Sequence, residues 1–273
     1  MKKCIVVADW GDDSLNRQEF KSVVEGFAKD SGVVNIGFIS STPSTIHTSF
    51  LVSQIIETEE RYGRPNNTIV FQNTDPRLQT EAGVKEAKGA QFMVMKLKSG
   101  IFVCGPNAGY DFSLIKEKVD ELYYYSGLDG GSQFRSRDMY ARVCAHLMDG
   151  MEDELELEET SFTDIPELKG YYVGHIDNFG NIKTTITHEE LKGKYEFGDE
   201  IKIGINTVEK HAIFAANLFG AERGKLVVYP GSSGKKENTY LEISVWRHFT
   251  EKDTSTGARI FNHPRPGAEI KLD

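Results

Sequence analysis

The sequence of 273 residues has few cysteines, no long apolar run and no excess of basic residues. The three cysteines, Cys4, Cys104 and Cys144, are far apart in the sequence. Such an odd, scattered set is more typical of buried reduced thiols than of disulfides or a zinc site. The apolar run at residues 4–8 is too short for the core of a signal peptide, and no stretch approaches the roughly 18 apolar residues of a membrane span. These absences predict a cytoplasmic protein without a membrane partner.

The charge balance and the missing motifs narrow the function classes further. The chain has 32 basic and 41 acidic residues, a formal net charge of −9, and no dense run of Lys and Arg, which argues against nucleic acid as a partner. The seven histidines lack the spacing of a metal site. No GxxxxGK[ST], GxSxG, or GxGxxG after the first strand occurs, so an NTPase, an α/β-hydrolase or a dinucleotide oxidoreductase is disfavoured.

The first half of the chain alternates strand and helix signals. A helix with one apolar face and Ser14 as its N-cap is predicted after the first strand, and a second helix is predicted from about Ser44 to Tyr62. A third is predicted over 136–149, with Ser136 as its N-cap. The continuous apolar runs are typical of buried strands. The predicted strands are 4–8, 33–39, 68–73, 91–97 and 101–104, the last two forming a hairpin.

The second half has a different pattern. The acidic stretch 152–159 is predicted to be a solvated linker. Short alternating runs follow it at 171–176, 182–187, 200–205, 225–229, 240–245 and 268–272, which is an all-β pattern. We therefore expect an α/β domain over residues 1–160, with a central, mostly parallel sheet flanked by helices. A smaller all-β, barrel-like domain is expected over residues 161–273.

Polar clusters follow several predicted strands of the first half. Ligands in an open α/β sheet bind beyond the carboxyl ends of its strands, and Asp9, Asp13 and Asp75 all occupy such positions. A carboxylate there can accept both hydroxyls of a ribose, but it can equally cap a helix or close a turn. For Asp75 we favour function, because Arg77 is near enough in the sequence to hold its charge.

Four other polar segments have both a structural and a functional interpretation. Asn107 lies in a Pro-Asn-Ala-Gly turn after a strand. Arg135 and Ser136 lie at a helix N-terminus, which predicts either an anion or lone-pair site or a cap with a surface pair between Arg137 and Asp138. The segments 174–181 and 231–234 are explained by a hairpin turn and a polar loop, respectively, without any function.

Taken together and in order, these segments resemble one family. It contains the S-adenosylmethionine (SAM) hydroxide adenosyltransferases and the related fluorinase and chlorinase. Each piece is short, but seven in the same order over almost the whole chain are fairly specific. The pieces are Asp9-Trp10-Gly11, Thr42-Pro43, Thr74-Asp75-Pro76, Pro106-Asn107-Ala108-Gly109, Phe134-Arg135-Ser136-Arg137-Asp138, Ile176-Asp177-Asn178-Phe179-Gly180-Asn181, and Ser233-Gly234 with Leu241-Glu242-Ile243.

The resemblance implies a homotrimer with SAM or adenosine as its small-molecule ligand and no cofactor. Each site would lie between the first domain of one subunit and the β domain of the next. The reaction it implies is attack of water or hydroxide on the ribose 5′ carbon of SAM, which gives adenosine and methionine. It also implies binding roles. Asp9 or Asp13 would hold the ribose hydroxyls, Phe179 with Ser232 and Ser233 the adenine or methionine part, and Asp177 the methionine ammonium, with Asn107 and Asn181 in the same substrate-binding set.

The catalytic set implied by the resemblance is Asp75, Arg77, Arg135 and Ser136, and it departs from the family pattern. The hydrolases are expected to use an Asp–Arg–His set, whereas this chain has Ala82 in place of that arginine and Arg135 in place of the histidine. Arginine stays protonated and cannot act as a base, although it can stabilise hydroxide. The alternatives are a catalytically inactive SAM- or adenosine-binding protein and, more distantly, a SAM-dependent halogenase. Asp75 disfavours the halogenase because a carboxylate repels a halide.

Overall fold

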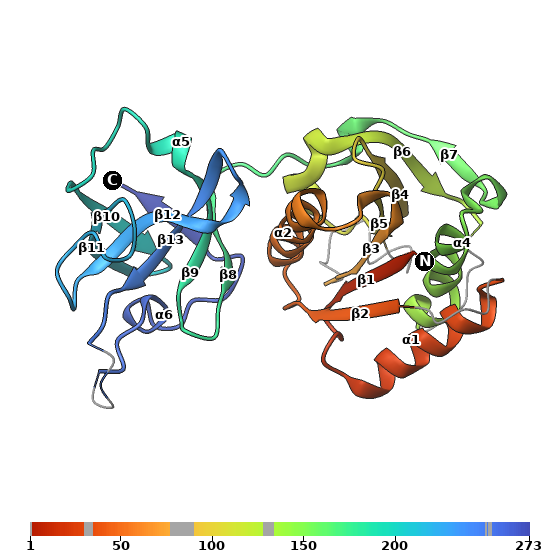
Figure 1. Ribbon diagram of the computed structural model, residues 1–273, viewed down its shortest axis with the longest axis horizontal. Helices are drawn as coiled ribbons and strands as arrows, with labels where there is room; N and C mark the ends of the chain where they lie inside the picture. Colours follow the sequence, from red (N-terminus) through yellow and green to blue (C-terminus); the bar gives the residue numbers. More distant parts are fainter. Residues whose placement is uncertain (1, 30–34, 77–89, 128–133, 249, 251–252) are drawn as a thin grey trace. The chain divides into compact units, whose positions relative to one another are not determined.

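The computed structural model divides the chain into two compact units, residues 1–168 and 169–273 (Figure 1). The structure describes residues 2–29, 35–76, 90–127, 134–248, 250 and 253–273. Arg77 and Ala82 therefore lie outside the described residues.

A seven-stranded sheet in the order β2-β1-β3-β5-β4-β6-β7 forms the centre of the first unit. Its strands are β1 (Lys3–Ala8), β2 (Asn35–Ser40), β3 (Thr68–Asn73), β4 (Phe92–Leu97), β5 (Phe102–Pro106), β6 (Val119–Tyr125) and β7 (Leu157–Glu159). The first four in the order are parallel, and β4, β6 and β7 join antiparallel. The predicted sheet and hairpin are confirmed. The carboxyl ends of β1, β3 and β5 consequently meet at one edge.

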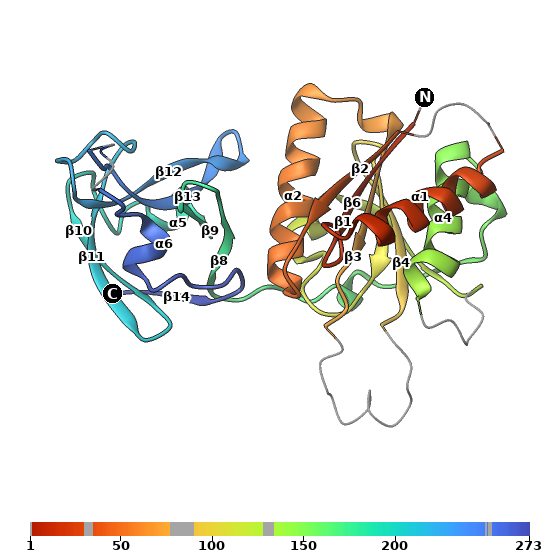
Figure 2. The ribbon, with the colours of Figure 1, turned by 90° about the horizontal axis from the view of Figure 1, so that it is seen from below.

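Helices cover both faces of this sheet (Figure 2). Helix α1 (Ser14–Phe27) and helix α4 (Ala141–Asp149) pack on one face, where Val6 and Phe71 point. Helix α2 (Thr45–Tyr62) covers the other face, where Val7 and Val70 point. Burial on both faces is the reason that β1 and β3 contain continuous apolar runs, residues 4–8 and 69–71. The short helices of the unit are η1 (Pro65–Asn67), η2 (Ser113–Lys118), η3 (Ser136–Tyr140), η4 (Glu152–Glu154) and η5 (Phe162–Asp164). No helix in the described ranges combines the length and the apolar character that a membrane crossing requires.

The helix starts differ in part from the sequence expectation. The predicted start of α2 near Ser44 is confirmed, and the structure shows that Ser44 caps this helix, because its Oγ accepts the His47 N–H. Helix α1 is capped by Asp13 rather than by Ser14, since Asp13 Oδ1 accepts the Asn16 N–H at 2.9 Å. Ser136 makes no capping hydrogen bond to any residue that the structure describes. The predicted helix 136–149 begins instead as the π turn η3, which follows Arg135 and runs directly into α4. Single π turns occur frequently at functional sites.

The predicted linker over 152–159 is wrong. Leu157–Glu159 is the edge strand β7, paired with β6, and Leu155 and Leu157 pack on the apolar core of the first unit. Two apolar side chains in alternation with acids were the signal for an edge strand that the acidic composition concealed. Residues 161–168 also stay with this unit. Ile165 is buried, and its carbonyl accepts the Lys116 Nζ at 2.7 Å.

The three cysteines are free and buried, as predicted. They lie on β1, β5 and α4 and meet in the core, where the Sγ atoms of Cys104 and Cys144 are 4.0 Å apart. Burial raises the pKa of the Cys144 thiol well above its ordinary value, and the neighbouring thiols raise it further. The Cys144 thiol is therefore a protonated core residue.

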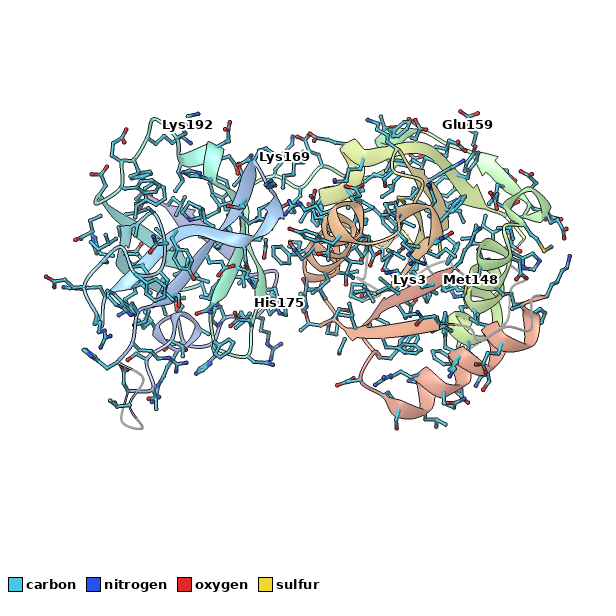
Figure 3. All side chains as sticks on the ribbon, in the orientation of Figure 1. Lys3, Met148, Glu159, Lys169, His175 and Lys192 are labelled. Carbon is cyan, nitrogen blue, oxygen red and sulfur yellow. The ribbon has the colours of Figure 1, made fainter. Side chains whose placement is uncertain are left out.

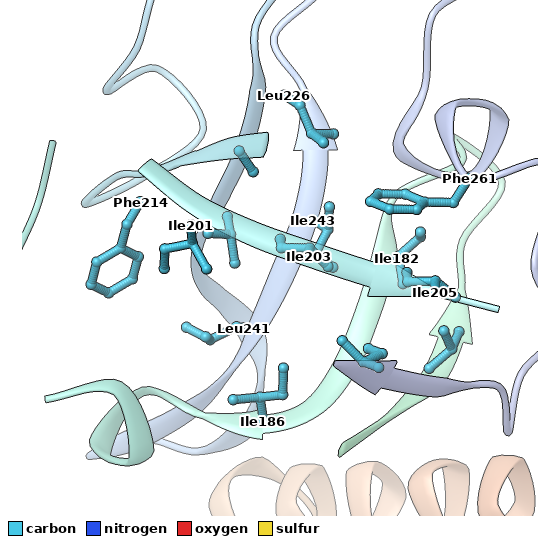
Figure 4. Packing of buried hydrophobic residues seen from close by; sticks show 14 of the residues in the cluster. Ile182, Ile186, Ile201, Ile203, Ile205, Phe214, Leu226, Leu241, Ile243 and Phe261 are labelled. Atoms are coloured by element: carbon cyan, nitrogen blue, oxygen red, sulfur yellow. The ribbon is translucent and has the colours of Figure 1, made fainter. Parts of the chain in front are cut away.

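The second unit is a closed barrel in the order β10-β11-β12-β13-β9-β8-β14, which confirms the barrel-like expectation. Apolar side chains from every strand fill its interior (Figure 4). Strand β11 was not predicted, because three consecutive exposed polar residues, 209–211, break its alternation. The elements are β8 (Tyr171–Ile176), β9 (Ile182–Thr187), α5 (His188–Leu191), β10 (Glu200–Ile205), β11 (Val208–Phe214), β12 (Leu226–Lys235), β13 (Asn238–Val245), α6 (Gly257–Ile260) and β14 (Glu269–Leu272).

Candidate functional site

Three aspartates gather at the carboxyl edge of the sheet in the first unit. Asp9 follows β1, Asp75 follows β3 and Asp111 follows β5. The Asp9 N–H donates to the Asn73 carbonyl at 3.3 Å, which joins the ends of β1 and β3. Burial raises the pKa of Asp111 well above its ordinary value, and the charges of Asp75 and Asp9 raise it further. The positions of Asp9 and Asp75 directly after strands predict their place at this edge, whereas Asp111, five residues beyond β5, was not predicted.

Asp111 is the most deeply placed member of this acidic cluster. Its side chain is 0% exposed, and Oδ2 accepts the Ala108 N–H at 3.1 Å, while Oδ1 has no hydrogen-bond partner within the part of the chain that the structure describes. Burial also raises the pKa of Asp9, and Asp75 adds to that rise. The raised pKa values of Asp9 and Asp111 show that this edge favours protons, hydroxyl donors or a cationic ligand.

A network of buried hydroxyls supports the backbone next to Asp75. The Thr74 Oγ1 is hydrogen-bonded to the Ser41 Oγ at 3.0 Å and to the Thr48 Oγ1 at 2.7 Å. Gln72 accepts the Thr74 N–H at 3.0 Å through Oε1 and donates to the Pro106 carbonyl through Nε2. The backbone that carries Asp75 is thereby tied to the end of β2, to α2 and to β5 at once.

Arg135 and Asp75 both lie near the phenol of Tyr140. Burial raises the pKa of Tyr140, Arg135 opposes that rise and Asp75 adds to it. Ser136 is buried at the start of the π turn η3. The structure therefore brings three of the four predicted catalytic positions to one region, and the fourth, Arg77, lies outside the described residues.

The other first-unit candidates have clear local roles. Asp13 is exposed and caps α1. Asn107 donates through Nδ2 to the Asp164 carbonyl at 2.8 Å, and its buried Oδ1 has no partner in the described ranges. Arg137 pairs with Asp138 at 2.6 Å, as the structural interpretation of that segment predicted.

In the second unit, Asp177 closes the turn between β8 and β9. Its Oδ1 accepts the N–H groups of Phe179 and Asn181 at 2.9 and 3.0 Å, and its Oδ2 accepts the Asn181 Nδ2 at 3.0 Å. Gly180 has a φ of 76°, a conformation that favours glycine. The turn leaves the Phe179 side chain 68% exposed, so it presents an apolar ring to a ligand or a partner.

A row of polar side chains crosses four adjacent strands of the barrel. The register pairs Tyr229 with Glu242, Glu242 with Lys183, and Lys183 with His175, and directly paired residues share one face of a sheet. Figure 3 draws the side chains of this unit and labels His175. Glu242 is 5% exposed, although its neighbours Leu241 and Ile243 point into the barrel interior. A charged residue between two apolar ones predicts a solvated outer position, so the sequence held no sign of this burial.

Glu242 binds the predicted substrate loop directly. Its Oε1 accepts both the N–H and the Oγ–H of Ser232, each at 3.0 Å, and the Lys183 Nζ at 2.7 Å. Burial alone would raise the pKa of Glu242, but the hydrogen bonds from Lys183 and Ser232 hold it below its ordinary value. Burial and the charge of Lys183 lower the pKa of His175. Ser233, next in the chain, is buried.

Comparison with known proteins gives a match to a family model within the second unit and a match to a curated relative. Residues 171–247 match the family model described as the SAM hydroxide adenosyltransferase C-terminal domain. The chain is 37% identical over 166 residues to the (R)-S-adenosyl-L-methionine hydrolase of Methanocaldococcus jannaschii, an alignment that covers 56% of this chain and 57% of that protein. The aligned part thus spans little more than half of that relative's length.

Two solved structures share the fold. An uncharacterized conserved protein from Thermotoga maritima superposes with a TM-score of 0.71 at 21% identity, covering 99% of this chain and 100% of that chain. A conserved hypothetical protein from Thermus thermophilus superposes with a TM-score of 0.65 at 18% identity and covers all of both chains. At these identities the likeness concerns the fold alone.

Proposed function

We propose that this chain is a member of the SAM hydroxide adenosyltransferase family and an enzyme that hydrolyses SAM to adenosine and methionine, which the family match of the second unit and the 37% identical SAM hydrolase support. The observation that carries the proposal is the acidic cluster of Asp9, Asp75 and Asp111 at the carboxyl edge of the sheet. A sulfonium cation joined to a ribose offers such a cluster both positive charge and hydroxyl donors.

In the proposed reaction, water attacks the 5′ carbon of the ribose in line with the carbon–sulfur bond. That bond breaks with its electron pair on sulfur, so methionine leaves as a neutral thioether and needs no acid. Asp75 orients the water and takes its proton, while Arg135, with Arg77, stabilises the hydroxide that develops. Ser136 completes the catalytic set. The protein otherwise contributes alignment in a dry site.

In this proposal the first unit of one subunit and the barrel unit of a neighbouring subunit supply the binding residues of one site. Asp9 holds the ribose hydroxyls, because Asp13 is committed to capping α1. Asn107 supports the same edge. In the barrel unit, Phe179, Ser232 and Ser233 hold the adenine or methionine part, and Asp177 with Asn181 holds the methionine ammonium. We further propose that the protein is a cytoplasmic homotrimer that works without a cofactor.

A catalytically inactive SAM-binding protein is the second candidate. It is favoured by two replacements. Arg135 in place of the family histidine cannot take a proton from water, and Ala82 in place of the family arginine cannot stabilise hydroxide. This candidate predicts measurable SAM affinity in calorimetry and no product.

The test is incubation of the purified protein with SAM in water enriched in oxygen-18, followed by chromatography and mass spectrometry. We expect adenosine that carries the label at its 5′ oxygen, together with methionine. Asp75→Ala should lower kcat at least about 100-fold, whereas the exposed Asp120→Asn should leave it unchanged. SAM binding without product would support the inactive candidate. A chloride-dependent 5′-chloro nucleoside would support a halogenase, and the absence of both binding and product would refute all three.

A further inference from the structure

Glu242 connects more groups than any other single side chain of the polar row. One oxygen, Oε1, accepts hydrogen bonds from the backbone and the side chain of Ser232 and from Lys183. The other oxygen, Oε2, accepts the Tyr229 hydroxyl at 3.2 Å. The Lys183 Nζ also donates to the Ser232 Oγ at 3.1 Å. The side chains of Glu242, Lys183 and Ser232 therefore form a set in which each is hydrogen-bonded to the other two.

A series of polar contacts connects this set to the turn at Asp177. The Ser244 hydroxyl lies beside the Tyr229 phenol and, on its other side, donates to the Asn181 Oδ1 at 2.5 Å. Asn181 in turn donates to Asp177. One hydrogen-bonded arrangement therefore reaches from Ser232 on β12 to Asp177 after β8.

The Ser232 segment needs such support because it is not held by regular strand pairing. The register between β12 and β13 shifts between Pro230 and Gly234, so residues 231–233 bulge from the ladder. The bulge packs directly on Glu242. A Cβ added to Gly231 would lie 2.6 Å from the Glu242 carboxylate carbon, so only glycine at this position lets the carboxylate reach the bulge.

The charge on Glu242 is balanced by Lys183 inside the same set. The side chains of Lys183 and Glu242 are 16% and 7% exposed. A buried carboxylate with a hydrogen-bonded ammonium partner is stable in one geometry, whereas removal of either partner leaves the other charged and unpaired. The ion pair therefore holds Ser232 in one position.

We propose that Glu242, neutralised by Lys183, is a positioning residue that holds the 231–233 bulge and the Asp177–Asn181 turn in a single arrangement ready to bind SAM. This inference rests on the proposed function, because those two segments are its adenine and methionine contacts. Glu242 itself acts through Ser232 and Asn181 and does not touch the reacting atoms.

The kinetic test compares Glu242→Gln, Lys183→Met and the double variant with wild type. Each single variant should raise KM for SAM at least tenfold and change kcat less than threefold, since ligand contacts are displaced while the chemistry in the first unit is intact. The double variant should be no worse than the singles, because the two side chains act as one unit. Glu209→Gln, which breaks the Lys202–Glu209 ion pair of 3.0 Å elsewhere on the barrel, should match wild type.

A ligand-free readout separates this inference from the proposed function. The Ser232 amide should exchange its hydrogen at least tenfold faster in Glu242→Gln than in wild type, whether or not SAM binds. Tyr229→Phe removes only the contacts of the phenol hydroxyl with Glu242 and Ser244, and it serves as the milder variant if Glu242→Gln does not fold. Unchanged Ser232 exchange, or a folded Glu242→Gln variant with wild-type KM, would overturn the positioning role. Wild-type protein that binds no SAM would instead refute the proposed function, and the SAM-binding part of this inference with it.

Discussion

The backbone N–H of Ala108 donates to Oδ2 of Asp111 at 3.1 Å, while Oδ1 of the same fully buried carboxyl has no partner among the residues that the structure describes. The turn after β5 therefore holds a carboxyl group beside Asp9 and Asp75, where ionisation is costly. A group of this kind links the protonation of the acidic cluster to the stability of the first unit.

We predict that Asp111 makes the protein less stable as the pH rises. The pKa of Asp111 is raised in the folded state, first by burial and then by Asp75 and Asp9, so the folded protein binds this proton more tightly than the unfolded chain. The stabilisation is complete below the ordinary Asp value of 3.8 and is lost as the pH rises towards the folded-state pKa. Relative to Asp111→Asn, wild type should lose about 1.4 kcal/mol of unfolding free energy per pH unit in that window.

Urea denaturation of both proteins at several pH values from about 4 to 8 measures this difference. Asp111→Asn keeps the shape of the side chain and an acceptor for the Ala108 N–H, so it isolates the titration. A difference between the two proteins that stays constant with pH would show that Asp111 is ionised in the folded state.

We predict that Asp13 has a structural role, as the cap of α1, and that Asp9 has a binding role. Asp13→Ala removes the cap of α1 and should cost about 1 kcal/mol of unfolding free energy, whereas Asp13→Ser restores a capping oxygen and most of the stability. Neither change should affect KM for SAM. Asp9→Asn should raise KM about tenfold through loss of a charge-assisted hydrogen bond to the ribose. Thermal unfolding and steady-state kinetics on the same preparations give both readouts, and a raised KM in Asp13→Ser would assign the ribose to Asp13.

Gly11 should be intolerant of any side chain. A Cβ at this position would lie 2.6 Å from the Ile39 carbonyl oxygen and 2.9 Å from that of Ala8, both backbone atoms that cannot move aside. Gly11→Ala should therefore cost about 2 kcal/mol. The matched control is Gly26→Ala in α1, where the added Cβ meets nothing within 4 Å and should stabilise the protein by up to about 1 kcal/mol. Equal unfolding midpoints for the two variants would contradict the close approach at Gly11.

Local patterns in the sequence were enough to predict much of the fold. Continuous apolar runs marked β1 and β3, the apolar stripe between about Ser44 and Tyr62 marked α2, and the change to short alternating runs marked the barrel. These features depend on residues a few positions apart, so their information is local. The same reasoning placed Asp9 and Asp75 together, because parallel strands end at a common edge.

Only the tertiary structure decided which further side chains join those sites. Asp111 lies five residues beyond β5 and enters the acidic cluster because its loop returns to the sheet edge, where the side chain is wholly buried. Lys183 and Glu242 are 59 residues apart and meet through the register of β9 with β13. Register and burial depend on pairing between distant segments, which no local pattern encodes. The sequence by itself therefore determined the long helices, most of the strands and their order, and the packing of those elements determined which charges lie side by side.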